Sequence, residues 1–308
     1  MGNSINPTQI TMYASLNLSE GNESGYPSAS LVPMTSSYQS NVAPHFDLVD
    51  GRTNPQLELG LAGGNVDPKI RCNLLDYPAS GSGVNAIIID NHNLENSFQP
   101  GDDAKDMRVQ ILYDVSSEYH LNEAYGGNLS GSLTQHTITS NKVNIEQNGI
   151  LVMNATGSGG MIKTDWELVF DRSSGDTYTN NGLIGEVALC HRFTTPFNPD
   201  QNSWAESIKY DGITKNEAIG GNIFTTELHK ERRVFTMIWS RLLLSQRHLF
   251  EDFFQLTGGE KHAFWISFNS DSSTPKFYRV RLISNTVRFR ERTPRTYELN
   301  FAVMEDLG

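Results

Sequence analysis

The amino-acid sequence predicts a mainly β protein with a single helix towards its C-terminal end. Short runs in which apolar and polar residues alternate recur along the chain, and clusters of Gly, Asn and Ser separate them. One segment has the apolar spacing of an amphipathic helix. With 37% hydrophobic and 19% charged residues, the composition excludes a charge-rich disordered chain.

Charge is distributed unevenly along the 308 residues. The chain has 24 Lys and Arg against 35 Asp and Glu, for a net charge of −11. Residues 226–308 hold 13 of the basic and 10 of the acidic residues, which leaves 11 and 25 for residues 1–225. The net charges of these two parts are therefore +3 and −14. The acidic total argues against a dedicated nucleic-acid binder, and the absence of any apolar run of about 18 residues predicts no membrane insertion.

Residues 1–45 are predicted to form an extended N-terminal arm. They contain 17 Ser, Thr and Asn but only two charged residues, Glu20 and Glu23, and show no lasting strand or helix period. Such a segment buries too little apolar surface to fold alone. Two interpretations stay open, namely an arm that lies on another subunit and a loose terminus.

Residues 46–193 are predicted to form a β-sandwich domain. Strands are expected near residues 86–90, 107–115, 165–172 and 186–190, because these runs alternate or are continuously apolar and end in turn-forming residues. Residues 194–228 are predicted to be a connector, since Pro196, Pro199 and the pair Gly220-Gly221 interrupt regular structure.

Residues 229–308 are predicted to form a small β domain covered by one helix. The run RRVFTMIWSRL reads as a strand with two apolar faces. A helix is expected to start at Ser245 as N-cap and to end at Gly258. Its buried side is predicted to comprise Leu249, Phe250, Phe253, Phe254 and Leu256. Four strands are expected to follow, in HAFWISF, FYRVRLI, TVRFRER and TYELNFAVM.

The sequence contains no catalytic signature, so no enzymatic activity and no cofactor are expected. The two cysteines, Cys72 and Cys190, lack metal-site spacing and read as reduced, buried residues. His248 and Glu251 have ligand spacing on the predicted helix, but a solvated helix face is the preferred interpretation. Calcium ligands at Asp102, Asp103 and Asp106 are also disfavoured, because a plain turn explains them without EF-hand spacing.

Asp90, His92 and Asn93 form the polar cluster that is the best candidate for a binding site, in the run IIIDNHNL. One interpretation is the rim of a glycan-binding site. The other, which is preferred, is a tight turn in which Asp and Asn satisfy the backbone and His92 packs beneath it.

Five arginines are candidates for an oligomer interface, because they occupy alternating positions on two consecutive predicted strands and should share one sheet face. They are Arg279, Arg281, Arg288, Arg290 and Arg292. Such a row can pair with acidic groups of a neighbouring subunit, or it can keep an exposed face soluble. Pairing with a neighbour is preferred because the rest of the chain is strongly negative.

The C-terminal domain resembles a pattern in tail proteins of tailed bacteriophages, in which a strand with an aromatic and a Leu precedes a helix with paired aromatics, a Gly and a Phe-Trp strand. The matching residues are Phe235, Trp239, Leu242, Leu249, Phe253, Phe254, Gly258, Phe264 and Trp265. The resemblance implies a tail-tube or distal-tail-type small β-sandwich or half-barrel with one flanking helix. In that family, copies join their sheets into a ring around the DNA channel.

The middle region resembles the galactose-binding-like, discoidin-type jelly roll that often precedes such a domain. The runs that carry this resemblance are AIIIDNHNL, RVQILYD, WELVF and IGEVALC. Cys190 departs from the pattern, which would place Gly there.

Together these resemblances imply a non-enzymatic structural protein of a bacteriophage virion, in the distal tail or the baseplate hub. The expected partners are further copies in a homo-oligomeric ring (a hexamer or a trimer), other tail proteins and a host-surface glycan, with DNA only as channel content. The protein would be synthesised in the host cytoplasm and reside in the virion tail.

Two other functions are weighed against this one. The first is a carbohydrate-binding module without catalytic activity. The second is a glycan-degrading enzyme, for which Asp165 and Glu167 beside Trp166 are the only candidate pair of catalytic carboxylates.

Overall fold

Two compact units make up the chain in this computed structural model. One unit comprises Met1–Met12 and Phe193–Leu307, and the other comprises Tyr13–Arg192 and Gly308. The chain passes between them within two strands, β1 (Thr11–Ser15) and β12 (Glu186–Thr194). The structure describes residues 10–16, 30–32, 57–59, 69–73, 83–92, 108–113, 136–137, 143–144, 149–154, 165–171, 182–200, 203–210, 213–217, 223–227, 231–268, 276–284 and 286–306.

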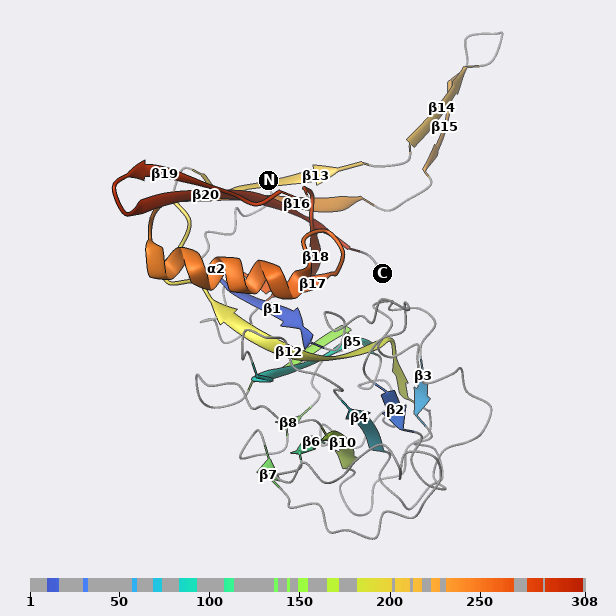
Figure 1. The fold of residues 1–308 in the computed structure, drawn as a ribbon. Coiled ribbons are helices and arrows are strands. Elements are labelled where there is room, and N and C mark those ends of the chain that lie inside the picture. The colour runs from blue at the N-terminus through green and yellow to red at the C-terminus, as the bar shows by residue number, and fades with distance from the viewer. Residues whose placement is uncertain are drawn as a thin grey trace. The chain divides into compact units, whose positions relative to one another are not determined.

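The unit with residues 193–307, called here the C-terminal unit, is an antiparallel sheet with one helix (Figure 1). Its elements are β13 (Ala205–Lys209), β14 (Ile213–Glu217), β15 (Ile223–Glu227), β16 (Arg232–Leu243), α2 (Leu244–Thr257), β17 (Phe264–Ser267), β18 (Phe277–Leu282), β19 (Arg288–Thr293) and β20 (Thr296–Glu305). The strand order is β13-β16-β20-β18-β17, and β19 also pairs with β20. The short strands β14 and β15 pair with each other in a separate two-stranded sheet.

An aromatic core lies between this sheet and α2. Along β16, Phe235, Met237, Trp239 and Leu242 are fully buried, whereas the residues between them are partly or fully exposed, so the strand is present but the expected burial of both its faces is wrong. Trp239 of β16 stacks on Phe301 of β20, with ring centroids 5.5 Å apart. Phe250 and Phe254 of α2 contact these two rings at 5.1 and 5.0 Å, which seats the helix along this face of the sheet (Figure 1).

Both ends of α2 have an identifiable cause. The helix starts at Leu244, and no side-chain oxygen of Ser245 caps it; instead the Leu243 backbone N–H donates to the Gln246 side chain at 2.9 Å. The helix ends at Gly258, which adopts φ 60°. That left-handed conformation suits glycine, so the predicted C-terminal end is confirmed and the predicted N-cap is wrong.

The other unit, called here the N-terminal unit, contains three groups of antiparallel strands. Its remaining elements are β2 (Ser30–Val32), β3 (Leu57–Leu59), β4 (Lys69–Asn73), β5 (Ala86–His92), β6 (Arg108–Tyr113), β7 (His136–Thr137), β8 (Val143–Asn144), β9 (Gly149–Asn154), β10 (Asp165–Asp171) and β11 (Gly182–Ile184). The pairing orders are β12-β5-β9, β2-β4-β10-β6-β7 with β8 also on β6, and β11-β3. The Ile-rich strand β5 lies between β12 and β9 and is almost wholly buried.

The mainly β fold with a single helix in the described residues is confirmed, and each predicted strand of residues 229–308 is present. Two regions differ from expectation. Residues 194–228, predicted as an irregular connector, contain β13, β14 and β15. Residues 11–15, inside the predicted arm 1–45, form the buried strand β1, whose strand partners lie far along the chain.

Candidate functional site: an arginine face on the sheet

All five predicted interface arginines lie on one face of the C-terminal unit's sheet, called here the arginine face. It consists of Arg279, Arg281, Arg288, Arg290 and Arg292. Arg281 of β18 is paired with position 304 of β20, while Arg288 and Arg290 of β19 are paired with positions 300 and 298. These three positions of β20 are separated by even numbers, so their partners point to the same side.

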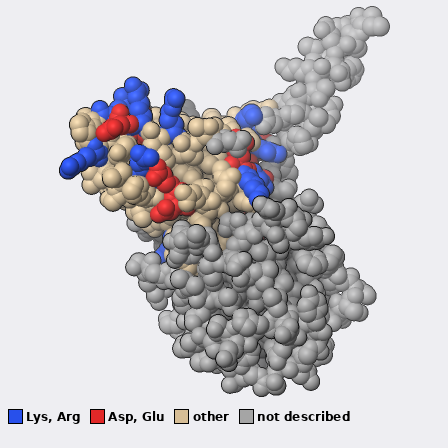
Figure 2. Space-filling model, in the orientation of Figure 1, with Lys and Arg blue, Asp and Glu red and all other residues tan. Residues whose placement is uncertain are grey.

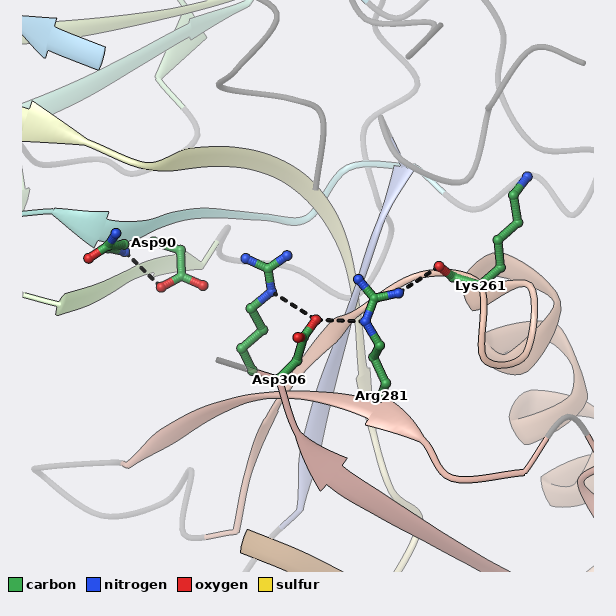
Figure 3. Close-up of polar contacts among 6 residues, drawn as sticks. Asp90, Lys261, Arg281 and Asp306 are labelled. Atoms are coloured by element: carbon green, nitrogen blue, oxygen red, sulfur yellow. Dashed lines mark hydrogen bonds and ion pairs between the residues drawn. The ribbon is translucent and has the colours of Figure 1, made fainter. Parts of the chain in front are cut away.

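The two arginines of β18 are held within the protein. Asp306, just after β20, places its carboxylate 2.6 Å from Arg281 Nε and 3.7 Å from Arg279 Nε (Figure 3). Arg281 also donates to the Lys261 carbonyl oxygen at 2.8 Å, and Arg279 is 4% exposed. This half of the arginine face is therefore a structural ion cluster that ties the end of β20 to β18 and to the turn after α2.

The arginines of β19 are more exposed and differ in their partners. Arg292 forms an ion pair with Glu298 of β20, with Nε 2.7 Å from the carboxylate. Arg288 and Arg290 are exposed, and among the described residues neither side chain forms a hydrogen bond or an ion pair. Figure 2 shows Lys and Arg side chains gathered over the region of β19 and β20.

The opposite face of the β19–β20 hairpin is fixed to α2 by Arg247. Its guanidinium lies over the rings of Phe289 and Tyr297, 5.2 and 4.8 Å from their centroids. The Glu251 side chain hydrogen-bonds the guanidinium and raises the pKa of Arg247. The hairpin is thus anchored on one side, which leaves Arg288, Arg290 and Arg292 exposed on the other.

Two edges of the described sheet in the C-terminal unit are open. Within the described residues β13 pairs only with β16, and β19 pairs only with β20. Ile208 and Tyr210, at the end of β13, are 51% and 60% exposed. This strand was not predicted from the sequence, because the two prolines before it indicated an irregular connector. The alternation of apolar and polar residues in WAESIKY could have indicated the strand.

Asp90 and His92 belong to the buried strand β5. Their exposed fractions are 5% and 3%, and the Asp90 carboxylate accepts a hydrogen bond from the Asn91 backbone N–H at 2.7 Å (Figure 3). Asn91 has φ 51°, so this carboxylate supports a tight local backbone. Burial lowers the pKa of His92 from 6.5 to about 4. Asp90 and His92 therefore lie in a buried strand and not in the expected turn, and Asn93 lies outside the described residues.

The metal-ligand candidates of the sequence are not brought together in the described residues. No group of three or more His, Cys, Asp or Glu among them has an arrangement that could hold a metal ion. His248 is exposed and Glu251 is paired with Arg247. Asp102, Asp103 and Asp106 lie outside the described residues. Burial raises the pKa of the Cys190 thiol well above its ordinary value, which keeps it protonated.

The acidic pair considered for glycan cleavage lies on β10. Position 165 is paired with position 73 of β4, and position 167 with position 71 of β4 and position 112 of β6. Strand β10 is therefore flanked on both sides by other strands of its sheet.

Comparison with protein-family models, curated proteins and solved structures finds no match to this chain. In the part of the chain that the structure describes, no helix has the length and apolar character needed to cross a membrane.

Proposed function

We propose that this chain is a non-enzymatic structural subunit of a bacteriophage tail, at the distal tail or baseplate hub, which assembles with its own copies into a ring. The sequence resemblance is the source of the tail assignment. The structure supports the assembly part of the proposal through the edges of the C-terminal unit's sheet.

The observation that carries the proposal is the pair of open edges. β13 and β19 lie on opposite sides of the central pair β16 and β20. An open strand presents unpaired backbone N–H and C=O groups, and soluble proteins cover such edges. Pairing of β13 in one copy with β19 in the next joins two different surfaces, and such head-to-tail contacts close into a ring when the rotation permits.

The separate β14–β15 hairpin adds a second observation. Its five paired positions are the full extent of its strand pairing in the described residues. A two-stranded hairpin alone is marginally stable in water, so a neighbouring copy or another tail protein would stabilise it.

Sedimentation velocity of the full chain over a wide concentration range tests the assembly. We expect a discrete oligomer, and we expect Ile208→Lys to weaken it, because a charge on the exposed β13 edge opposes strand addition. Leu249→Lys is the matched control, since Leu249 has a similar exposed fraction of 49% on α2.

Two results would contradict the proposal. One is a chain that stays monomeric at every concentration and is absent from purified virions. The other is equal assembly of the Ile208→Lys and Leu249→Lys variants, which would remove β13 from the interface.

A further inference from the structure

We propose that Arg288 and Arg290 of the arginine face bind the acidic part of a neighbouring copy of this chain, residues 1–225. This inference rests on the proposed assembly and names the surfaces that meet in it.

Arg288 and Arg290 are the two members of the arginine face whose side chains form no ion pair with a described residue. Nearby carboxylates are already used: Glu298 binds Arg292, and Asp306 binds Arg281. Glu291 of β19 accepts the backbone N–H of Arg295 at 3.4 Å. Two guanidinium groups on alternate positions, about 7 Å apart along one strand, therefore face outwards without a described partner.

The uneven charge of the chain makes a second copy a suitable partner for these two arginines. The chain itself carries −14 over residues 1–225 and +3 over residues 226–308, so a neighbouring copy supplies an excess of carboxylates over basic groups in residues 1–225. Complementary surfaces of this kind guide association and fix the register of an interface. A nucleic acid is the weaker candidate, because it carries negative charge only and residues 1–225 would repel it, whereas a second copy carries charges of both signs.

The position of the two arginines also fits the proposed assembly. Arg288 and Arg290 lie on β19, an open edge of the sheet, and their side chains share the face opposite Arg247 and α2. A copy that pairs its β13 with this edge brings its own surface beside the two guanidinium groups. The acidic residues of that copy then neutralise charges that the isolated chain leaves to solvent.

The test compares two double variants of the full chain. Arg288→Gln with Arg290→Gln removes the proposed contacts, and Arg241→Gln with Lys261→Gln removes the same charge from exposed side chains elsewhere in the C-terminal unit. Sedimentation velocity at low and high salt gives the concentration for half-assembly. Urea unfolding checks that both variants fold as the wild type does.

We expect the Arg288/Arg290 variant to require about threefold to tenfold more protein for half-assembly at low salt, as two exposed ion pairs imply. Its assembly should also depend less on salt than that of the wild type, because salt screens the lost attraction. The control variant should retain the wild-type salt dependence.

Each remaining outcome is decisive. A wild type that never assembles refutes the proposed function itself. A wild type that assembles, with both double variants indistinguishable from it, refutes only this inference. Fluorescence anisotropy with a labelled DNA duplex provides the other arm: duplex binding lost in the Arg288/Arg290 variant, with assembly unchanged, would assign the two arginines to nucleic acid and overturn the inference.

Discussion

Two adjacent residues of α2 give the sharpest test of how the C-terminal unit is held together. Phe250 is fully buried, whereas Leu249 is 49% exposed. The Phe250 ring lies 5.0 Å from that of Phe193, 5.1 Å from that of Trp239 and 6.4 Å from that of Phe254. Phe250 is thus one of the rings that join the helix to the sheet and to Phe193.

The perturbation is Phe250→Ala, with Leu249→Ala as its control. Truncation of a buried Phe leaves a cavity and removes aromatic contacts, so we expect a loss of about 3–5 kcal/mol in the free energy of unfolding. An exposed Leu on a helix should change it by less than about 0.5 kcal/mol, since Ala also favours helix.

Urea unfolding followed by tryptophan fluorescence measures both values. Three of the four tryptophans, Trp204, Trp239 and Trp265, belong to the C-terminal unit, so the signal reports mainly on it. With a urea slope of about 1–3 kcal/mol per molar, the Phe250→Ala midpoint should fall by more than about 1 M. Equal midpoints for the two variants would refute the proposed role of Phe250.

Three further changes have defined outcomes. Trp239→Phe should lower stability in urea by about 1–2 kcal/mol, because its Nε1–H donates to the Phe197 carbonyl oxygen at 2.9 Å and the variant leaves that oxygen unbonded. The free energy of unfolding of the N-terminal unit should fall by up to about 3 kcal/mol as pH falls from 6.5 to 4. The reason is that His92 binds a proton over this range in the unfolded chain, whereas folded His92 has a pKa lowered to about 4. The free energy of unfolding of the His92→Gln variant should depend less on pH. Gly258→Ala should lower the thermal midpoint, at a cost of about 1 kcal/mol, since φ 60° disfavours a side chain.

The local sequence pattern was sufficient to predict the strands and the helix of residues 229–308. The strands β16, β17, β18, β19 and β20 were predicted correctly from their apolar and alternating runs, but the burial of both faces expected for β16 is wrong. The end of α2 was also predictable, since Gly258 adopts the left-handed conformation that closes the helix. Leu249 was wrongly included in the buried face, because helical spacing does not reveal how wide the covered stripe is.

The sequence did not predict which strands and which charged side chains pair when they are far apart along the chain. The alternating arginines were correctly placed on one face, yet which of them are neutralised depends on Asp306, 25 residues from Arg281 along the chain. Likewise, β13 follows two prolines and is a strand because β16 offers it an edge. The burial of Asp90 and His92 depends on strands that flank β5 on both sides, which a local turn motif does not show.

The division of the C-terminal unit into two stretches of sequence affects how the polypeptide folds during synthesis. The Ile10 carbonyl oxygen accepts hydrogen bonds from both the backbone N–H and the hydroxyl of Thr195, so an early segment and a late one complete the same structure. At about 5–20 residues per second, the ribosome makes Thr195 roughly 10–40 s after Ile10. Until then the buried side chains of Ile10 and Met12 have no site, and the nascent chain must keep this apolar segment from aggregating.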